Sequence, residues 1–305
     1  MQYLVTGGTG FIGSHLVDEL VRIGHSVILL STRKHTDSRN EVTVVSGSIT
    51  NSSEIQNIFH DFEIDGVFHL AAFGNAPLSF TQQNKVHEIN VCGTENLLSA
   101  ASKADVSKVI FSSSALVYGK TTESLISEKQ PLSPLSPYAE SKIDGEKLCE
   151  HYLSEYGLQS VSLRYFNTYG PRQSAEGEYA AAIPRFCKMI VNGESPVIFG
   201  SGEQKRDFVY VKDIVSANIL AVQSNVSGVF NIGSGVSSSL NTIVSEIQRI
   251  AGTNIDIIYK PVRQEETSSV CADISLAKEA FNYSPQYSLR DGLEETVRFF
   301  QGRKD

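Results

Sequence analysis

Short apolar runs alternate with helical patterns along the first half of the chain. The runs that read as strands are Tyr3-Leu4-Val5, Val27-Ile28-Leu29-Leu30, Val42-Thr43-Val44-Val45, Val67-Phe68-His69-Leu70, Val109-Ile110-Phe111 and Val161-Ser162-Leu163. Apolar runs of this kind are typical of strands that are buried on both faces. Between the first two runs, Ile12, Leu16, Leu20 and Ile23 recur at helical spacing, and Gly24 stands where a helix would end. The pattern predicts a strand-helix-strand unit.

This unit repeats five times, so we expect an α/β protein with a Rossmann-type, doubly wound parallel sheet that binds its ligands beyond the carboxyl ends of the strands. After about residue 170, prolines divide the chain into shorter pieces, which predicts a smaller α/β substrate-binding lobe. We assign residues 1–170, with returning segments at about 206–235 and 268–280, to the dinucleotide-binding domain, and about 171–205, 236–267 and 281–305 to the second lobe.

Composition narrows the class of protein. The 305 residues are 41% hydrophobic and 20% charged, and no apolar run approaches the ~20 residues of a membrane span. We therefore expect a soluble, cytoplasmic protein without a signal peptide. A formal charge of −8 without a basic stripe argues against a nucleic-acid partner. The four scattered cysteines lack metal-site spacing, so reduced thiols and no metal are expected.

The first candidate site is the turn Thr6-Gly7-Gly8-Thr9-Gly10-Phe11-Ile12-Gly13. Gly7, Gly10 and Gly13 lie between a strand and a helix, where a dinucleotide needs a tight turn, close backbone approach and close helix packing. The N-terminus of the following helix offers free N–H groups and a partial positive charge to a pyrophosphate. Glycines also serve ordinary turns, but the flanking strand and helix favour a nicotinamide dinucleotide site.

The second strand lacks the acidic end that usually binds a ribose 2′-hydroxyl. Its place is taken by Ser31, and the cations Arg33 and Lys34 follow. A missing carboxylate and two nearby cations suit a 2′-phosphate, so we expect an NAD(P) cofactor with a preference for NADP over NAD. The alternative, that both cations are only solvated loop charges, stays open.

The second candidate site combines a serine-rich strand end with a helix start. Ser112, Ser113 and Ser114 end one strand, and Tyr138 and Lys142 lie four residues apart, on one face of a later helix. An ammonium beside a phenol favours the phenolate and brings it closer to use as a base at neutral pH. Ser114 is placed to hold the same substrate oxygen.

With these motifs in order, the chain resembles the extended short-chain dehydrogenase/reductase family, and within it the nucleotide-sugar 4-epimerases of the UDP-glucose 4-epimerase type. The further segments that carry the resemblance are His69-Leu70-Ala71-Ala72, Asn90-Val91-Cys92-Gly93-Thr94, Arg164-Tyr165-Phe166-Asn167-Thr168-Tyr169-Gly170-Pro171-Arg172, Gly202-Glu203-Gln204-Lys205-Arg206-Asp207-Phe208-Val209 and Asn231-Ile232-Gly233-Ser234-Gly235. In that family, the tyrosine takes a proton from a sugar hydroxyl while hydride passes to the cofactor. The keto-sugar then turns over and regains the hydride on its other face.

The resemblance also implies site residues. Besides the glycine turn, Ser31 and Arg33, cofactor contacts are expected from Phe11, Ile12, Ser48, Ile49, Leu70, Ala71, Ala72, Asn90, Ser112, Tyr138, Lys142 and Tyr165. The substrate contacts are expected from Asn167, Phe199, Arg206, Arg263, Glu266 and Val270. Two separated arginines are what a diphosphate needs, although each alone could be a surface ion pair. Ser48 stands where the family has an aspartate beside adenine.

Sibling dehydratases and decarboxylases carry acids directly after the reacting serine or threonine, where this chain has Ala115 and Leu116. A nucleotide-4-keto-sugar reductase using NADPH is the alternative, since it needs the same Ser-Tyr-Lys set. A third interpretation is a redox-sensing protein that binds the dinucleotide but has lost catalytic activity. The presence of Ser114, Tyr138 and Lys142 together disfavours it, because a sensor does not need all three. The resemblance further implies a UDP-hexose or UDP-N-acetylhexosamine substrate, with Val270 leaving room for an N-acetyl group, and a homodimer through helices at about 86–104 and 138–156.

Overall fold

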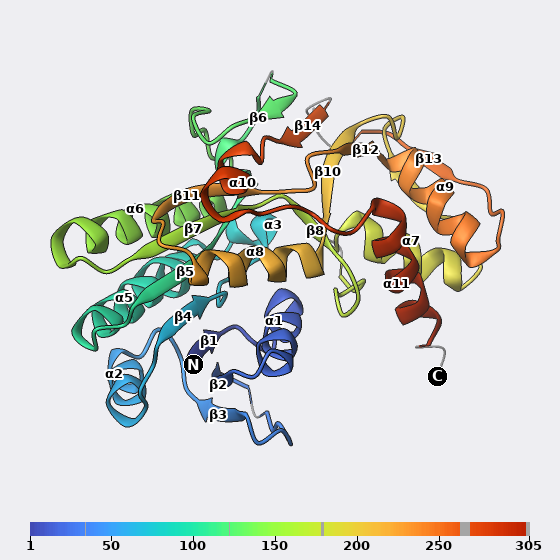
Figure 1. Cartoon of the computed structure of the whole chain (residues 1–305). Helices are drawn as coiled ribbons and strands as arrows, with labels where there is room; N and C mark the ends of the chain where they lie inside the picture. The colour runs from blue at the N-terminus through green and yellow to red at the C-terminus, as the bar shows by residue number, and fades with distance from the viewer. Residues whose placement is uncertain (34, 122, 178–179, 263–268, 303–305) are drawn as a thin grey trace.

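A parallel sheet of seven strands forms the centre of the computed structural model, which describes residues 1–33, 35–121, 123–177, 180–262 and 269–302 (Figure 1). Its strand order is β11-β7-β5-β4-β1-β2-β3. The strands in chain order are β1 (Gln2–Thr6), β2 (Ser26–Ser31), β3 (Val42–Ser46), β4 (Gly66–His69), β5 (Lys108–Ser114), β7 (Ser160–Tyr165) and β11 (Gly228–Ile232). The order reverses between β1 and β4, which is where such sheets open a crevice for ligands.

Helices cover both faces of this sheet. The helices α2 (Ser52–Asp61), α5 (Gly93–Lys103) and α6 (Pro137–Tyr156) pack side by side on one face, and α1 (Phe11–Arg22) packs beside α8 (Val211–Gln223) on the other. Side chains alternate between the two cores along each strand. On β1, Tyr3 and Val5 join the core beneath α1 and α8, whereas Leu4 joins the core beneath α2, α5 and α6. Double burial explains why these strands read as continuous apolar runs.

The second lobe has its own sheets and core. A five-stranded sheet contains β6 (Leu125–Ile126), β8 (Asn167–Tyr169), β10 (Lys205–Tyr210), β12 (Ser237–Ser239) and β14 (Ser269–Ala272), and β9 (Val197–Phe199) pairs with β13 (Ile258–Lys260). The helices here are α7 (Ala182–Val191), α9 (Leu240–Ala251) and α11 (Leu289–Gln301), which bury a third cluster that includes Ile183, Ile243 and Leu293. The described residues also form the short helices α3 (Ala76–Ser79), α4 (Gln83–His87) and α10 (Ser275–Phe281), a π-helical turn at Glu88–Cys92 and a 3-10 turn at Ala115–Tyr118.

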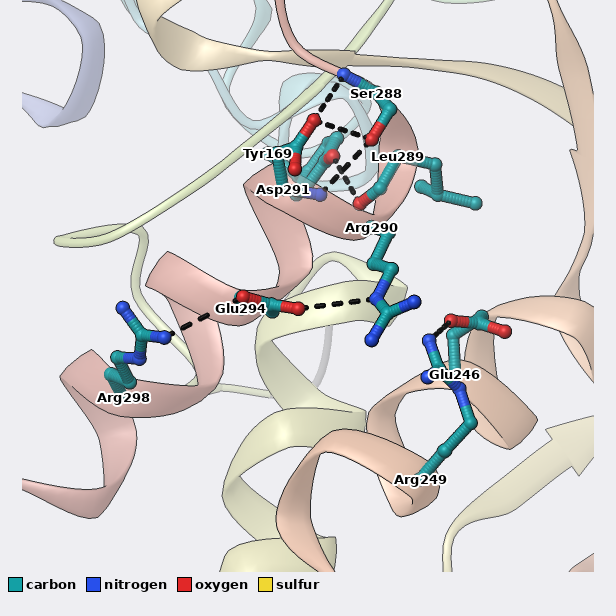
Figure 2. Close-up of polar contacts among 9 residues, drawn as sticks. All are labelled: Tyr169, Glu246, Arg249, Ser288, Leu289, Arg290, Asp291, Glu294 and Arg298. Carbon is teal, nitrogen blue, oxygen red and sulfur yellow. Dashed lines mark hydrogen bonds and ion pairs between the residues drawn. The ribbon is translucent and has the colours of Figure 1, made fainter.

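Polar contacts at the start of α11 join this helix to strand β8 of the second lobe (Figure 2). Ser288 and Asp291 form a reciprocal capping box, which satisfies N–H groups that the first helical turn leaves open. The Tyr169 hydroxyl, from the end of β8, donates to the Leu289 carbonyl at 3.1 Å. Farther along, Glu294 lies between Arg290 and Arg298 on the exposed side. The capped helix end therefore holds the strand that leads into the cleft described below.

The predicted doubly wound parallel sheet is confirmed, and all six apolar runs lie in it. The sheet gains a seventh strand, β11, at its edge beside β7. The two returning segments divide between the sheets: β11 and α8 join the large sheet, whereas β10 and β14 pair with each other. Among the described residues, no helix combines the length and the apolar character that a membrane crossing requires.

The close approach of α6 to β5 depends on one glycine. A Cβ atom on Gly145 would lie 2.3 Å from the ring of Phe111, which is buried in the core. Gly145→Ala should therefore lower the free energy of unfolding by about 1–3 kcal/mol through overpacking. Gly74→Ala is the control, because a Cβ there meets no atom within 4 Å. Chemical denaturation of both variants measures the effect, and equal stabilities would contradict this account of the contact.

Candidate active site

Three side chains meet where β5 ends and α6 begins. Ser114 is the last residue of β5, and it lines the same cleft as Tyr138, which lies in the first turn of α6. One helical turn later, the Lys142 ammonium donates to the Ser112 carbonyl at 2.7 Å. The same ammonium lies 5.8 Å from the centre of the Tyr138 ring and 4.9 Å from that of Phe111. The residues predicted as catalytic are thus brought together.

Burial controls the protonation of this group. Loss of solvent lowers the pKa of Lys142 to about 8, against an opposing effect of Glu146, and only 3% of Lys142 is exposed. Burial also raises the pKa of Tyr138, while the nearby Ser114 hydroxyl acts in the opposite direction. The phenol is therefore protonated at neutral pH in this structure, and the adjacent cation and hydroxyl are the groups that would favour its anion.

The backbone of Tyr138 is held from both sides. Its N–H donates to the buried hydroxyl of Ser79 at 3.2 Å, and its carbonyl accepts from Ser141 at 2.7 Å. Ser141 in turn accepts from the Asn90 amide at 2.9 Å. The other contacts of that amide are the N–H and the carbonyl of Phe73. Asn90 is one of the residues expected at the cofactor, and in the structure its side chain joins the loop after β4 to the helix that carries Tyr138.

Asn90 lies in a π-helical turn, Glu88–Cys92, which continues into α5. Such single turns occur often at functional sites, since they turn a side chain away from the regular helical face. Ser79, Ser141 and this role of Asn90 were missed because their partners are distant in the sequence, at separations of 59 for Ser79 and 51 for Asn90 with Ser141.

The glycine turn has the shape that a pyrophosphate requires. Gly7 has a φ of +71°, and a Cβ there would lie 2.6 Å from the Ala71 nitrogen. A Cβ on Gly13 would lie 2.3 Å from the Gly7 carbonyl oxygen. No side chain caps α1 at Gly10, so the N-terminus of this helix is not closed by its own cap. These residues fit the dinucleotide that the sequence predicted, because the backbone itself forms the cradle.

A buried histidine orders the strand ends beneath this cradle. The Thr94 hydroxyl donates to the Asn90 carbonyl, so it accepts from His69 Nε2 at 3.0 Å. His69 Nδ1 then accepts from Thr6 at 2.7 Å, and the same Thr6 oxygen accepts from the Ala71 N–H. Burial lowers the pKa of His69 to about 3, so the ring is neutral. The chain of hydrogen bonds joins β1, β4 and α5.

Beside the glycine turn lies a pocket of about 390 Å³, lined by Gly8, Thr9, Ser14, Val17, Asp18, Leu29, Arg33, His35, Asp37, Arg39 and Arg172. Arg39 pairs with both Asp37 and Asp18, and Arg172 also pairs with Asp18. Arg33 is exposed, and its backbone forms a turn with the buried Ser31 hydroxyl. Arg33 thus lies where the sequence placed it, with acids that the sequence analysis missed. Lys34 lies outside the described residues.

The other expected cofactor residues fall into groups: some contact other parts of the fold, some follow β4 beside the glycine turn, and some line the cleft next to Tyr138. Ser48 bonds to Thr50 and Glu54, and Ile49 packs against Gly93, so the structure shows both in contacts within the fold. The backbone of Leu70, Ala71 and Ala72 follows β4 beside the glycine turn. Ser112 offers its carbonyl to Lys142, as described above. Phe11, Ile12 and Tyr165 line the cleft next to Tyr138, and the Tyr165 hydroxyl donates to Asn218.

A cleft of about 660 Å³ extends from Ser114 and Tyr138 into the second lobe. It brings in three of the residues expected at the substrate: Asn167, Arg206 and Val270. Arg206 and Val270 face each other in the register of β10 and β14. Phe199 lies on β9 outside the described lining, and its carbonyl accepts from Gln204, which does line the cleft. Arg263 and Glu266 lie outside the described residues.

The strands that carry Arg206 and Val270 are joined by a buried carboxylate. Asp207 accepts from the N–H groups of Ser234, Gly235 and Ala272 at 2.7, 2.9 and 3.1 Å, and none of its surface is exposed. This acid stands next to Arg206 in the motif quoted above, but its partners could not be read from the sequence.

With this geometry in place, comparison with known proteins decides the family. Residues 3–233 match the model of the NAD dependent epimerase/dehydratase family. The chain belongs to that family. It is similar to a UDP-N-acetyl-alpha-D-glucosaminuronate decarboxylase of Bacillus cytotoxicus, with 33% identity over 98% of this chain and 97% of that protein. The expected resemblance to nucleotide-sugar-modifying enzymes of the extended short-chain dehydrogenase/reductase type is confirmed.

Solved structures agree on the fold. The structure of UDP-glucose 4-epimerase from Thermotoga maritima with UDP-glucose superposes with a TM-score of 0.94, at 35% identity over all of both chains. The UDP-N-acetylglucosamine 4-epimerase from Methanobrevibacter ruminantium M1, in complex with UDP-N-acetylmuramic acid, also gives 0.94 at 35% identity, covering 99% of this chain and 98% of that one. Together with the family match, these similarities confirm that the chain is an enzyme of the nucleotide-sugar epimerase group.

Because His69 is neutral in the folded protein, the stability of the fold should depend on pH. Its pKa in the folded protein lies below the value near 6.5 in the unfolded chain, so the unfolded state binds the proton first as the pH falls. The stability that His69 contributes is therefore lost below about pH 6.5, at up to about 1.4 kcal/mol per pH unit. His69→Asn should be destabilised at pH 7.5, and its difference from the wild type should shrink between pH 6.5 and 5.

Denaturant unfolding of both proteins across this pH range provides the measurement. His60→Asn is the control for the loss of an imidazole, because the His60 side chain is 87% exposed and its loss should leave the stability of the fold nearly unchanged. A stability difference for His69→Asn that stays constant with pH would show that His69 is not held neutral.

Proposed function

We propose that the chain is a nucleotide-sugar 4-epimerase, which inverts the C4 hydroxyl of a UDP-hexose or UDP-N-acetylhexosamine. The observation that carries this proposal is the cleft in which Ser114 and Tyr138 lie at one end and Asn167 and Arg206 farther along. In the proposed reaction Tyr138 takes the proton of the C4 hydroxyl, Ser114 holds that oxygen, and Lys142 supplies positive charge beneath the phenol. A bound nicotinamide supplies the oxidation and re-reduction at C4.

The diphosphate end is proposed from charge and position. Arg206 brings a cation to the cleft, and the Asn167 amide offers a neutral donor. We keep Arg263 and Glu266 as proposed partners of the diphosphate and of the base ribose, and Phe199 as a neighbour of the base. Val270 lines the cleft with a side chain of medium size, which supports acceptance of N-acetylated sugars.

Epimerisation is favoured over elimination or decarboxylation by the residues after Ser114. Ala115 and Leu116 line the cleft there, so neither position offers the acid that those reactions use in sibling enzymes. A 4-keto-sugar reductase would use the same three residues. The two activities differ in cofactor use, because an epimerase works with catalytic nicotinamide and a reductase consumes one NADPH for each product.

We also propose a homodimer, through the adjacent helices at about 86–104 and 138–156. In the structure these segments correspond largely to α5 and α6, which pack side by side on one face of the sheet. Sedimentation of the purified protein tests this assembly independently of its chemistry.

Tyr138→Phe is the sharpest test of the reaction. The change removes the proposed base and should lower kcat by roughly 10²- to 10⁴-fold, because a positioned acid or base contributes that much. Tyr156→Phe, at the exposed end of the same helix, should keep full activity. Turnover of UDP-, dTDP-, GDP- and ADP-sugars with catalytic nicotinamide is followed by NMR, and a nucleotide-4-keto-sugar is supplied separately with stoichiometric NADPH, because a reductase needs a ketone to accept the hydride. Unchanged turnover in Tyr138→Phe would refute the mechanism, and turnover that consumes NADPH would establish the reductase.

For the cofactor we propose a preference for NADP. The supporting residues are Ser31, which leaves no carboxylate at the strand end, and the exposed Arg33 at the rim of the pocket beside the glycine turn. Asp37 in the same pocket has both carboxylate oxygens bound by Arg39, so its charge is balanced. The rival arrangement is that Asp37 receives the ribose hydroxyls of NAD.

Arg33→Ala separates these two arrangements. Loss of a charge-assisted contact should weaken NADP binding by about 10-fold and leave NAD binding unchanged. Arg22→Ala is the matched control, since Arg22 is exposed, pairs with Glu19 and lies outside this pocket. Calorimetric titration with both dinucleotides gives the affinities. Tighter binding of NAD than of NADP by the wild type would overturn the proposed preference.

A further inference from the structure

A third residue continues the catalytic face of α6. Tyr138, Lys142 and Glu146 follow one another at four-residue steps, so they lie on the same face of the helix. Only 3% of Lys142 and 7% of Glu146 are exposed. The reaction proposed above gives no task to Glu146, although a buried carboxylate is costly unless charged and polar partners surround it.

Those partners are present. Arg164 on β7 binds Glu146 with two parallel contacts, from Nε to Oε1 at 2.9 Å and from one terminal nitrogen to Oε2 at 2.6 Å. The Ser113 hydroxyl also donates to the Glu146 carboxylate. Arg164 is 5% exposed, so this ion pair lies in the core directly below the end of β5. Two-pronged arginine pairs fix direction as well as distance.

The far side of Arg164 is fixed as well. Its other terminal nitrogen donates to the Tyr118 hydroxyl at 2.9 Å, and that hydroxyl donates to Asn231 on β11 at 2.6 Å. The Asn231 amide donates to the Ile126 carbonyl on β6 at 2.9 Å. The guanidinium therefore cannot turn away from Glu146 without breaking a buried chain of hydrogen bonds.

We propose that Glu146, oriented by Arg164, is a positioning residue that aligns the Lys142 ammonium and the reacting end of β5. The geometry supports this directly. Lys142 binds the carbonyl of Ser112, Glu146 binds the hydroxyl of Ser113, and Tyr138 and Ser114 line the same cleft. One face of α6 thus lies along three consecutive residues of β5. This inference rests on the proposed function for the meaning of the alignment, though not for its existence.

Electrostatics give Glu146 a second effect on Lys142. The described titratable and charged groups that face this ammonium are Tyr138, Glu146 and Cys149 on α6, His69 on β4 and Arg164 on β7. His69 is neutral, and burial raises the pKa of Cys149 to about 12, so this thiol is neutral too. The Glu146 carboxylate is then the group that opposes the lowering of the Lys142 pKa by burial. The positive charge of Arg164, which is paired with Glu146, weakens the effect of that carboxylate on Lys142.

Glu146→Gln and Arg164→Met should move the titration of Lys142 in opposite directions. Without the carboxylate, the midpoint should fall by about 1 pH unit, and without the guanidinium it should rise, because the anion loses its competing partner. NMR of protein carrying ¹³C-labelled lysine reads this midpoint without substrate, with Lys142→Met identifying the signal. The basic limb of the kcat profile should shift with it, while KM stays within about twofold.

Ser160→Ala is the control for a merely structural role. It removes a buried hydrogen bond from β7 to the Cys149 carbonyl of α6, one turn beyond Glu146, and changes no charge. Its stability should fall while the Lys142 midpoint stays unchanged. If Glu146→Gln behaved in the same way, the proposal would be overturned.

Two further outcomes are informative. Should either charge-removing variant fail to fold, the other decides, and Glu146→Asp provides a milder case in which the carboxylate is withdrawn by one methylene. Its midpoint should fall by less than that of Glu146→Gln, and an unshifted midpoint would again refute the proposal. A wild type without epimerase activity but with the predicted NMR shifts would refute the proposed function and leave the coupling of Glu146 to Lys142 intact.

Discussion

The contact between α6 and β5 is the constraint on which the site depends. It holds an ammonium group, that of Lys142, with 3% of the residue exposed. An ammonium at this depth must be compensated, and the compensation comes from the Ser112 carbonyl, from the anion of Glu146 and from two aromatic rings. Gly145 allows the helix to lie close enough for these contacts. The close packing of α6 on β5 and the compensation of the Lys142 charge therefore depend on the same interface.

The order of the strands brings the remaining parts to this interface. Because the sheet reverses between β1 and β4, the glycine turn after β1 lies against the backbone after β4, where a Cβ on Gly7 would touch Ala71. His69 and Asn90 then connect those loops to α5 and to the turn that bears Tyr138. In the second lobe, Asp207 ties β10 to β14. Each connection uses a buried polar group whose hydrogen bonds are made, which favours one arrangement over many.

Local patterns were enough to predict much of this. The apolar runs predicted the strands, since doubly buried strands are apolar on both faces, and the spacing of Gly7, Gly10 and Gly13 predicted the turn. The four-residue step from Tyr138 to Lys142 predicted their shared face. Each of these signals lies within a few residues of sequence, where helix and strand periodicity fix geometry.

The rest depends on contacts between distant segments. Nothing in the sequence near Glu146 shows that Arg164 is its partner, and nothing near Asn90 shows that its amide binds Phe73 and Ser141. The acids in the pocket beside the glycine turn come from a helix and a loop, so the spacing that located Arg33 could not locate Asp18 and Asp37. Such polar pairings are fixed by the folded topology.

We propose that one site removes hydrogen from C4 of a UDP-sugar and returns it to the same carbon. Substrate deuterated at C4 tests this most directly, by NMR of the product after incubation in ordinary water. The account predicts an epimer that keeps the deuterium at C4 without net consumption of nicotinamide. Formation of the epimer with hydrogen from water at C4 would contradict it.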